Sequence, residues 1–255
     1  MTRPIFYAAP EDLADLGPGE TYVLDGAEGH HAATVRRLAA GEALDLVDGR
    51  GTRVPGVVEA VLDAGLEVGV TGPPVRDQGS GVVLVQALAK GDRDLMAVEM
   101  ATELGVDGVV PWQAERSIVR WKGERAAKAH AKWERTAAAA AKQARRAAIP
   151  AVYDLHSSAE LPAAFDPGDR VLVLHEEAEL GLSEALRREP AAARQGGSGT
   201  TYLVVGPEGG ISPAELEALT GAGGTAVRLG RDVLRTSTAG AAALAVLHAA
   251  SGYWS

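Results

Sequence analysis

Short apolar runs alternate with segments of helical periodicity from residue 82 onward, and this alternation limits the possible folds more than any other feature of the chain. The apolar runs have the length and branched residues of buried strands. They are VVLVQAL (82–88), VDGVVPW (106–112), VLVLHE (171–176), TYLVVG (201–206) and AVRLG (226–230). The helical segments cover residues 92–105, 122–147, 212–219 and 237–251. Strands that alternate with helices predict an α/β fold with a mostly parallel sheet covered on both faces.

Residues 1–72 follow a different pattern, in which short alternating strands are separated by Gly, Asp and Pro. The strand-like segments are TYVLDG, ALDLVDGRG, TRVPGVVEAVLD and GLEVGVTG. Closely spaced strands of this kind predict a small β-barrel or sandwich, interrupted by one short helix over residues 30–39. A stretch rich in Gly and Pro follows and predicts a linker. We therefore expect a small domain over 1–72, a linker over 73–81 and an α/β domain over 82–255.

The composition excludes several classes of protein. The chain has no cysteine, which excludes disulfide frameworks, thiolate metal sites and Cys nucleophiles. Its six His residues lack metal-ligand spacing, so no metal site is predicted. There is no GxxxxGKS/T phosphate loop, HExxH motif or GxSxG elbow. We see neither a signal peptide nor a run long enough to span a membrane, and we expect a soluble cytoplasmic protein.

The net charge of −9 hides a segregation of charge along the chain. Between Arg116 and Arg146 there are ten Lys or Arg residues and only two acids, so this segment carries +8 and the remainder −17. A positive segment on an acidic protein is typical of a surface that binds RNA or DNA. A solvated amphipathic helix with surplus charge has the same composition, and charge alone does not separate the two interpretations.

Three predicted strands end in glycines or polar residues. Gly206–Gly210 lie between a buried strand and a helix whose start is marked by Ser212 and Pro213. The strand at 171–176 ends on His175 and Glu176, and the segment after AVRLG contains Arg235 and Thr236. Because ligands of open α/β sheets bind at the carboxyl ends of strands, these three loops predict one pocket.

The same loops carry a resemblance to a known family. GPEGGISPAELEAL and LGRDVLRTSTAGAAAL are similar to the carboxyl-terminal signature of the RsmE family of SPOUT methyltransferases, which methylate N3 of a uridine in 16S ribosomal RNA. HHAATVRRLAAGEALDLVDGRG, ATELGVDGVVPWQAERSIVRW and AKQARRAAIP resemble other blocks of that family, in the family's order. The resemblance implies a PUA-like β-barrel, a SPOUT domain with a carboxyl-terminal trefoil knot, a homodimer, and S-adenosylmethionine as cofactor.

Carried over position by position, the resemblance implies a set of cofactor-binding residues in the three loops: Leu174, His175, Glu176, Gly206, Pro207, Glu208, Gly210, Leu229, Gly230, Leu234 and Thr236. Arg235, beside this pocket, is the candidate for stabilising the charge that develops on the uracil ring. The candidates for contacts to ribosomal RNA come from the positive segment and the small domain: Arg3, His31, Arg37, Arg116, Lys142, Gln143, Arg145 and Arg146. Trp112, Trp121 and Trp133 could stack on bases, but core packing or a dimer interface is the better default.

Two departures from the family pattern and two alternatives accompany this hypothesis. Many members have RTETA where this chain has Ser237 in place of the acidic residue, and many have Lys where it has Met100. No residue is identified as the base that accepts the N3 proton. A SPOUT enzyme acting on another RNA site, such as a ribose 2′-hydroxyl, is one alternative. An RNA-binding assembly factor that has lost catalysis is the other.

Overall fold

A computed structural model describes residues 3–188 and 199–254 of the chain, which divides into two compact units. The first unit contains the described residues up to Gln78 together with Ala141–Ile149, and the second contains the rest. The domain boundaries expected from sequence therefore differ from the structure. Ile149 N–H donates to Gly49 O at 2.9 Å and Gly51 N–H donates to Ala147 O at 3.2 Å, so a distant segment joins the first unit through hydrogen bonds.

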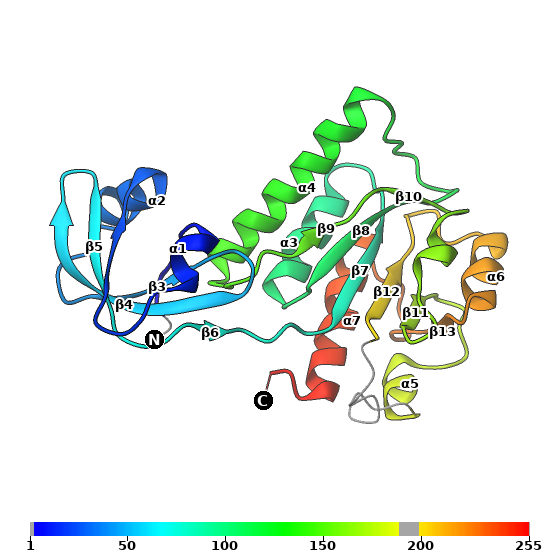
Figure 1. Cartoon of the computed structure of the whole chain (residues 1–255). Helices are drawn as coiled ribbons and strands as arrows, with labels where there is room; N and C mark the ends of the chain where they lie inside the picture. The colour runs from blue at the N-terminus through cyan, green and yellow to red at the C-terminus, as the bar shows by residue number, and fades with distance from the viewer. Residues whose placement is uncertain (1–2, 189–198, 255) are drawn as a thin grey trace. The chain divides into compact units, whose positions relative to one another are not determined.

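The first unit is built on a sheet with the strand order β1-β3-β4-β5-β2, in which β6 also pairs with β4 (Figure 1). The pairings are antiparallel except that of β1 with β3. The strands are β1 (Ile5–Tyr7), β2 (Thr21–Leu24), β3 (Ala43–Val47), β4 (Thr52–Leu62), β5 (Gly65–Val70) and β6 (Val75–Arg76). The helical segments are α1 (Pro10–Ala14), α2 (Gly26–His30) and the π-helical turn η1 (His31–Val35). Apolar residues that alternate along these strands form one core, which includes Phe6, Leu24, Leu44, Leu46 and Leu66.

The four strands expected in the first seventy-two residues are confirmed as β2, β3, β4 and β5. The helix expected over 30–39 is wrong in its bounds, since α2 begins at Gly26 and η1 ends at Val35. The expected linker is also wrong in part. Its residues Val75 and Arg76 form β6 against β4, and Asp77 accepts a hydrogen bond from Arg53 Nη2 at 3.0 Å. Backbone pairing and one ion pair thus hold a segment whose composition predicts flexibility.

The second unit contains the expected parallel sheet, with the strand order β10-β8-β7-β12-β11-β13 and β9 paired with β8. The strands are β7 (Val82–Ala87), β8 (Gly108–Gln113), β9 (Ala151–Val152), β10 (His156–Ser157), β11 (Arg170–Leu174), β12 (Thr201–Val205) and β13 (Thr225–Val227). The helices are α3 (Arg93–Glu103), α4 (Glu124–Gln143), the 3-10 turn η2 (Leu161–Ala164), α5 (Leu182–Arg188), α6 (Pro213–Gly221) and α7 (Thr236–Ser251). The α/β fold predicted from the alternation is confirmed.

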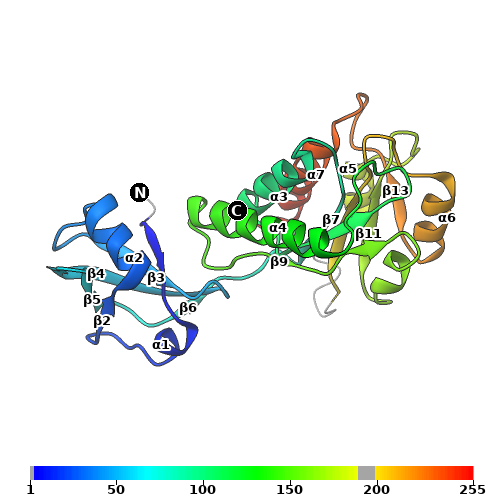
Figure 2. The same cartoon turned by 90° about the horizontal axis from the view of Figure 1, so that it is seen from above.

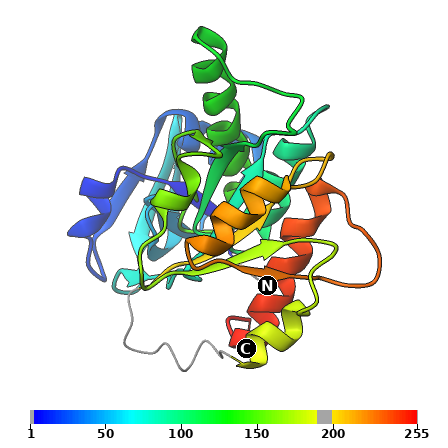
Figure 3. The same cartoon turned by 90° about the vertical axis from the view of Figure 1, so that its right-hand side faces the viewer.

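Helices cover both faces of this sheet. On one face α3 and α7 lie side by side (Figure 2), and Gly240 of α7 sits against Leu84 of β7, where an added Cβ would lie 2.8 Å from Leu84 Cδ1. On the other face α6 lies against the sheet (Figure 3), and its Leu219 packs with Val85 and with Leu161 of η2. The side chains of successive β7 residues point to opposite faces, as the pleat requires.

The helix α4 is shorter than its sequence predicts. It ends at Gln143 instead of residue 147, because Arg145 adopts a left-handed conformation with φ of +57° that stops the helical path. Three tryptophans are buried in the second unit, with Trp121 and Trp133 packed edge to face at 5.4 Å between ring centroids. Core packing, one of the two defaults expected for them, is confirmed. Within the described residues, no helix is both long and apolar enough to cross a membrane.

Candidate functional site

The loop between β12 and α6 is built for close backbone approach. An added Cβ at Gly206 would lie 2.7 Å from Ile211 Cγ1, so any larger residue would displace that side chain. Gly210 has a φ of +73°, a conformation that glycine adopts without strain. The Ser212 hydroxyl accepts a hydrogen bond from Glu215 N–H, and the Glu215 carboxylate accepts one from Ser212 N–H, which completes a capping box. The cap fixes where the loop ends and the helix begins.

A buried threonine ties this loop to two other elements. The Thr236 hydroxyl donates to Gly206 O at 2.7 Å, and it accepts from Gln86 Nε2 at 2.8 Å. Thr236 opens α7, Gln86 lies near the end of β7, and both side chains are buried. The ends of β7 and β12 are thereby held against the start of α7, although Gln86 and Thr236 lie 150 positions apart in the sequence.

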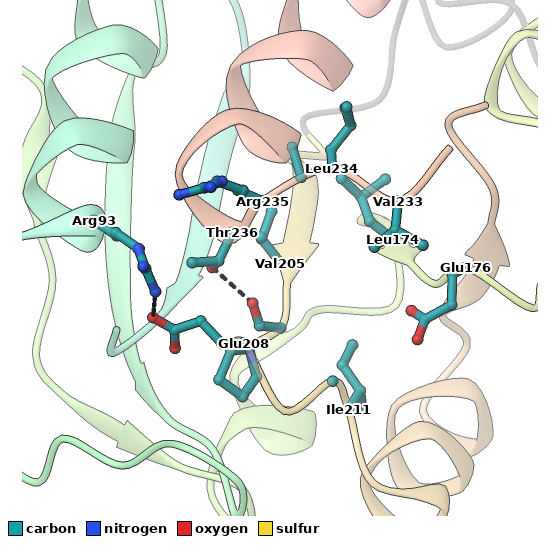
Figure 4. A pocket seen from close by; sticks show the side chains of 14 residues that line it. Arg93, Leu174, Glu176, Val205, Glu208, Ile211, Val233, Leu234, Arg235 and Thr236 are labelled. Atoms are coloured by element: carbon teal, nitrogen blue, oxygen red, sulfur yellow. Dashed lines mark hydrogen bonds and ion pairs between the residues drawn. The ribbon is translucent and has the colours of Figure 1, made fainter. Parts of the chain in front are cut away.

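A second link joins the loop after β7 to the loop after β12. Arg93 Nη1 lies 2.8 Å from Glu208 Oε1, and Lys90 N–H donates to the same oxygen at 3.1 Å (Figure 4). Burial alone would raise the pKa of the Glu208 carboxyl. Hydrogen bonds from its own backbone N–H, from Arg93 and from Lys90 outweigh burial and hold that pKa below its ordinary value. Glu208 is thus an ionised anchor for the Arg93 guanidinium.

These loops enclose a cavity with two adjoining lobes. The arginine lobe has a volume of about 360 Å³ and contains Arg93, Glu208 and Arg235. The glycine lobe has a volume of about 290 Å³ and contains His175, Leu229 and Gly230. The residues common to both lobes are Leu174, Glu176, Val233, Leu234 and Ala239. The shared wall is therefore apolar apart from one carboxylate.

Comparisons with known proteins place the chain in a family. A family model described as an RNA methyltransferase domain matches residues 77–248, and a model described as an RNA methyltransferase PUA domain matches residues 24–65. A protein from Mycobacterium bovis named Ribosomal RNA small subunit methyltransferase E is 44% identical and covers 100% of this chain and 94% of its own length. A protein of the same name from Bacillus subtilis is 31% identical, with 89% of each chain covered. The chain belongs to the ribosomal RNA small subunit methyltransferase E family.

Solved structures of similar proteins agree with this family. A crystal structure of Ribosomal RNA small subunit methyltransferase E from Neisseria gonorrhoeae, bound to S-adenosyl methionine, has a TM-score of 0.80 to this chain at 28% identity. It covers 97% of this chain and 98% of its own. A putative methyltransferase from Legionella pneumophila, solved with its bound cofactor SAM, has a TM-score of 0.75 at 26% identity and covers 98% of each chain. The similarity extends over both units.

The residues that the family resemblance implies for the cofactor come together in one place. All eleven line the cavity. Five of them, from the loop after β12 and the start of α7, line the arginine lobe alone: Gly206, Pro207, Glu208, Gly210 and Thr236. Three line the glycine lobe alone: His175, Leu229 and Gly230. The remaining three, Leu174, Glu176 and Leu234, belong to the shared wall. Arg235 is exposed and lines the arginine lobe beside them.

Arg93 is one of the cavity residues that sequence reasoning missed, as are Arg228, Arg231 and Asp232 of the glycine lobe. Arg93 follows β7 in the segment KGDR, at the same edge of the sheet as the other loops. A signal for it was present, because the rule that singles out residues after the other strands applies equally to the residues after VVLVQAL. Its partner Glu208 lies 115 positions away, and no spacing pattern relates the two.

The expected RNA contacts are distributed differently. Seven of the eight lie in the first unit, and Arg116 lies in the second, where its Nη1 donates to Gly209 O at 3.1 Å. Arg3 Nη1 lies 3.5 Å from Asp45 Oδ1, and Lys142 forms an ion pair with Glu28 at 2.5 Å. These pairs reduce the positive charge that the sequence count assigns to the surface.

The remaining residues of that group also lie in the first unit. His31 lies 6.1 Å from Phe6 between ring centroids. Arg37 is exposed, with a φ of +54°, and Gln143 is exposed at the end of α4. Arg145 O accepts from Arg53 Nη2 at 3.1 Å, and Arg146 lies close enough to Tyr7 to influence its pKa. Among the residues that the structure describes, no group of three or more His, Asp or Glu side chains could hold a metal ion.

Proposed function

We propose that this chain transfers a methyl group from S-adenosylmethionine to N3 of a uridine in the 16S RNA of the small ribosomal subunit. The observation that carries the proposal is the coincidence of the family's cofactor positions with one cavity at the carboxyl ends of β7, β11 and β12. The RNA of the small ribosomal subunit is proposed as the substrate from the name of the relatives, and N3 of uridine as the methylated atom from the resemblance in sequence.

The residues present fit S-adenosylmethionine. Leu174, Leu229 and Leu234 offer apolar contacts of the kind that an adenine ring requires. The Glu176 carboxylate, which points into the cavity (Figure 4), suits either ribose hydroxyl groups or a cationic sulfonium. Gly206 and Gly210 let backbone groups approach the ligand without a Cβ in the way. When bound, S-adenosylmethionine supplies a methyl group on a positively charged sulfur.

The chain contributes alignment and charge stabilisation to the reaction. Thr236 and Gln86 fix the loop after β12, so that the cavity is formed before either ligand arrives. The uracil ring gains negative charge as N3 loses its proton, and Arg235 lies at the cavity to stabilise that charge. These are positioning and electrostatic roles that need no metal-ligand side chains.

The first unit supplies contacts to ribosomal RNA in this proposal. The match to a PUA domain supports this role, and so does the gathering of Arg37, Lys142, Gln143, Arg145 and Arg146 in that unit. Most of these contacts would be to phosphates, which position the RNA without reading its sequence. The ion pairs of Arg3 and Lys142 would have to exchange a carboxylate for a phosphate.

The proposal extends to a closed PUA-like barrel, a carboxyl-terminal trefoil knot, a homodimer and a cytoplasmic location beside the ribosome. Two hydrogen bonds support the knot, because Arg228 N–H donates to Leu180 O at 2.8 Å and the Thr236 hydroxyl donates to Gly206 O at 2.7 Å, which ties the segment between β13 and α7 to two earlier loops. Tyr253 and Trp254 support the dimer, since these neighbouring aromatic side chains are 38% and 52% exposed in the single chain.

A single labelling experiment tests the proposal. The purified protein is mixed with labelled S-adenosylmethionine and small ribosomal subunits that lack their own uridine N3 methyl group, and the RNA is digested to nucleosides. Label in 3-methyluridine is the expected result. Label in a 2′-O-methylated nucleoside would replace the base with the ribose as the acceptor. Binding of the cofactor without transfer, while a known enzyme labels the same particles, would leave the protein an RNA-binding factor or an enzyme for another RNA.

A further inference from the structure

The two lobes of the cavity carry different side chains. The arginine lobe contains the guanidinium groups of Arg93 and Arg235 together with Glu208, whereas the glycine lobe contains Leu229 and Gly230 together with Arg228, Arg231 and Asp232. A methyl transfer must hold two ligands at once, with the acceptor beyond the methyl group of the donor. A cavity of two lobes that share one wall meets that requirement.

Arg93 is arranged to bind something in addition to Glu208. Among the described residues its side chain bonds through Nη1 alone, at 2.8 Å from Glu208 Oε1, and the side chain is 39% exposed. A guanidinium has five N–H donors in a planar fork, so several remain for a ligand. In Figure 4 the Arg235 side chain extends above Thr236 on the side of the cavity where Arg93 lies.

Uracil without its N3 proton matches this arrangement. The negative charge of the anion is shared among N3 and the two flanking carbonyl oxygens, O2 and O4. Donors that stay charged and face those oxygens stabilise the anion more than the neutral base, which is the condition for accelerating the reaction. Resting on the function proposed above, we infer that the part of the arginine lobe beside Arg93 and Arg235 is the uracil subsite, next to the cofactor-binding loop 206–210. Arg93 and Arg235 donate to the two carbonyl oxygens, and Glu208 positions Arg93.

The reaction balances without a dedicated base on the protein. The N3 proton leaves to water, the N3 lone pair attacks the methyl carbon, and the bond between that carbon and sulfur breaks with its electron pair on sulfur. The products are 3-methyluridine, S-adenosylhomocysteine and one proton. Glu208 is poorly suited to accept the proton, because its hydrogen bonds to Arg93 and Lys90 stabilise the carboxylate and lower its pKa.

The variant Arg93→Ala separates this role from a role in binding the cofactor. We expect kcat to fall about a hundredfold, the usual effect of removing one donor to a developing anion, while the Kd for S-adenosylmethionine stays within about threefold of wild type. The deficit should shrink as pH rises from neutral toward 9, because alkali replaces the lost stabilisation of the uracil anion. Subunits reconstituted with 5-fluorouridine in the RNA, whose N3 proton is more acidic, should also restore the variant more than wild type.

Two further variants guard against loss of structure. Glu208→Gln keeps the shape of the anchor and removes its charge, so we expect a smaller fall in kcat with the same dependence on pH. Lys132→Ala breaks the 2.9 Å ion pair between Lys132 of α4 and Asp92, which directly precedes Arg93 at the start of α3. This pair lies outside the cavity, so the variant should leave kcat unchanged.

The outcomes that overturn the inference are distinct from failure of the proposed function. A constant deficit at every pH, matched by an equal rise in the Kd for S-adenosylmethionine, would assign Arg93 to the cofactor's own carboxylate. Wild-type kcat in Arg93→Ala would leave it with no role in the subsite. In both cases the wild-type protein still forms 3-methyluridine, whereas the proposed function fails only if the wild type does not.

Discussion

The loops of the second unit and the basic residues of the first unit are both expected to be functional, but only the loops come together in one site. Every implied cofactor residue of the second unit lines one cavity. In the first unit Arg3 and Lys142 form ion pairs with Asp45 and Glu28. The loops are predicted from the topology of the sheet, and parallel strands necessarily bring their carboxyl ends to one edge. The RNA-binding residues are predicted partly from charge, which does not specify which carboxylate or phosphate a basic side chain contacts.

The substitution Arg235→Ala should have the largest effect, and it tests whether the second unit holds more than a binding cavity. We expect methylation to fall by about 10²–10³-fold, as when one donor to a developing anion is removed. The Kd for S-adenosylmethionine should change little, since Arg235 lines the part of the arginine lobe that is proposed to hold uracil. Isothermal titration and single-turnover kinetics measure the two quantities. A parallel loss of both would make Arg235 a residue that builds the cavity instead.

The substitution Thr236→Val tests the link that brings the loops together. It leaves Gln86 Nε2 without its 2.8 Å acceptor and Gly206 O without its donor in a buried site. A buried polar group without a partner costs about 1–3 kcal/mol, so the free energy of unfolding should fall by that amount in urea titrations. Thr238→Val, on the exposed side of the same helix, is the control and should change stability by less than about 0.5 kcal/mol.

Arg37 tests whether the first unit contains a basic residue that binds RNA, because it is exposed and no ion pair is found for it among the described residues. Its left-handed φ of +54° favours glycine, so Arg37→Gly should be neutral or stabilising by up to about 1 kcal/mol. If Arg37 contacts a phosphate, the same change weakens RNA binding and lowers the salt dependence of affinity by about one unit of slope. Arg36→Gly, at an ordinary φ of −79°, should instead destabilise the protein. Unchanged RNA affinity in Arg37→Gly would remove Arg37 from the interface.

The smallest effect concerns the pH dependence of stability at Glu208. Its pKa is lower in the folded protein, so the carboxylate stabilises the fold above its unfolded pKa of about 4.3, and this contribution is lost as pH falls through the folded pKa. Wild type should therefore exceed Glu208→Gln in thermal stability near neutral pH, with the difference shrinking below about pH 4. Scanning calorimetry at several pH values measures it. A difference that grows on acidification would contradict the ionised anchor.

Much of the fold and the cavity was predictable because the signals were local. Buried strands appear as apolar runs, and the Ser212–Glu215 capping box marks the start of α6 within four residues. The predicted loops followed from strand ends and from family motifs at those ends. The bounds of α4 were not predictable, because Arg145 leaves the helical conformation where its sequence favours continuing. Nor was the membership of Ala141–Ile149 in the first unit, which depends on hydrogen bonds to the turn at Gly49 and Gly51.

The sequence by itself determined the α/β alternation, the small β unit before it, the family, and which loops meet at the edge of the sheet. Only the tertiary structure showed that Arg93 meets Glu208, that Thr236 bonds both Gln86 and Gly206, and that Lys142 meets Glu28. The physical reason is distance along the chain. Periodicity and capping act within a few residues, whereas these contacts join positions 30 to 150 apart and form only when the strands are in register.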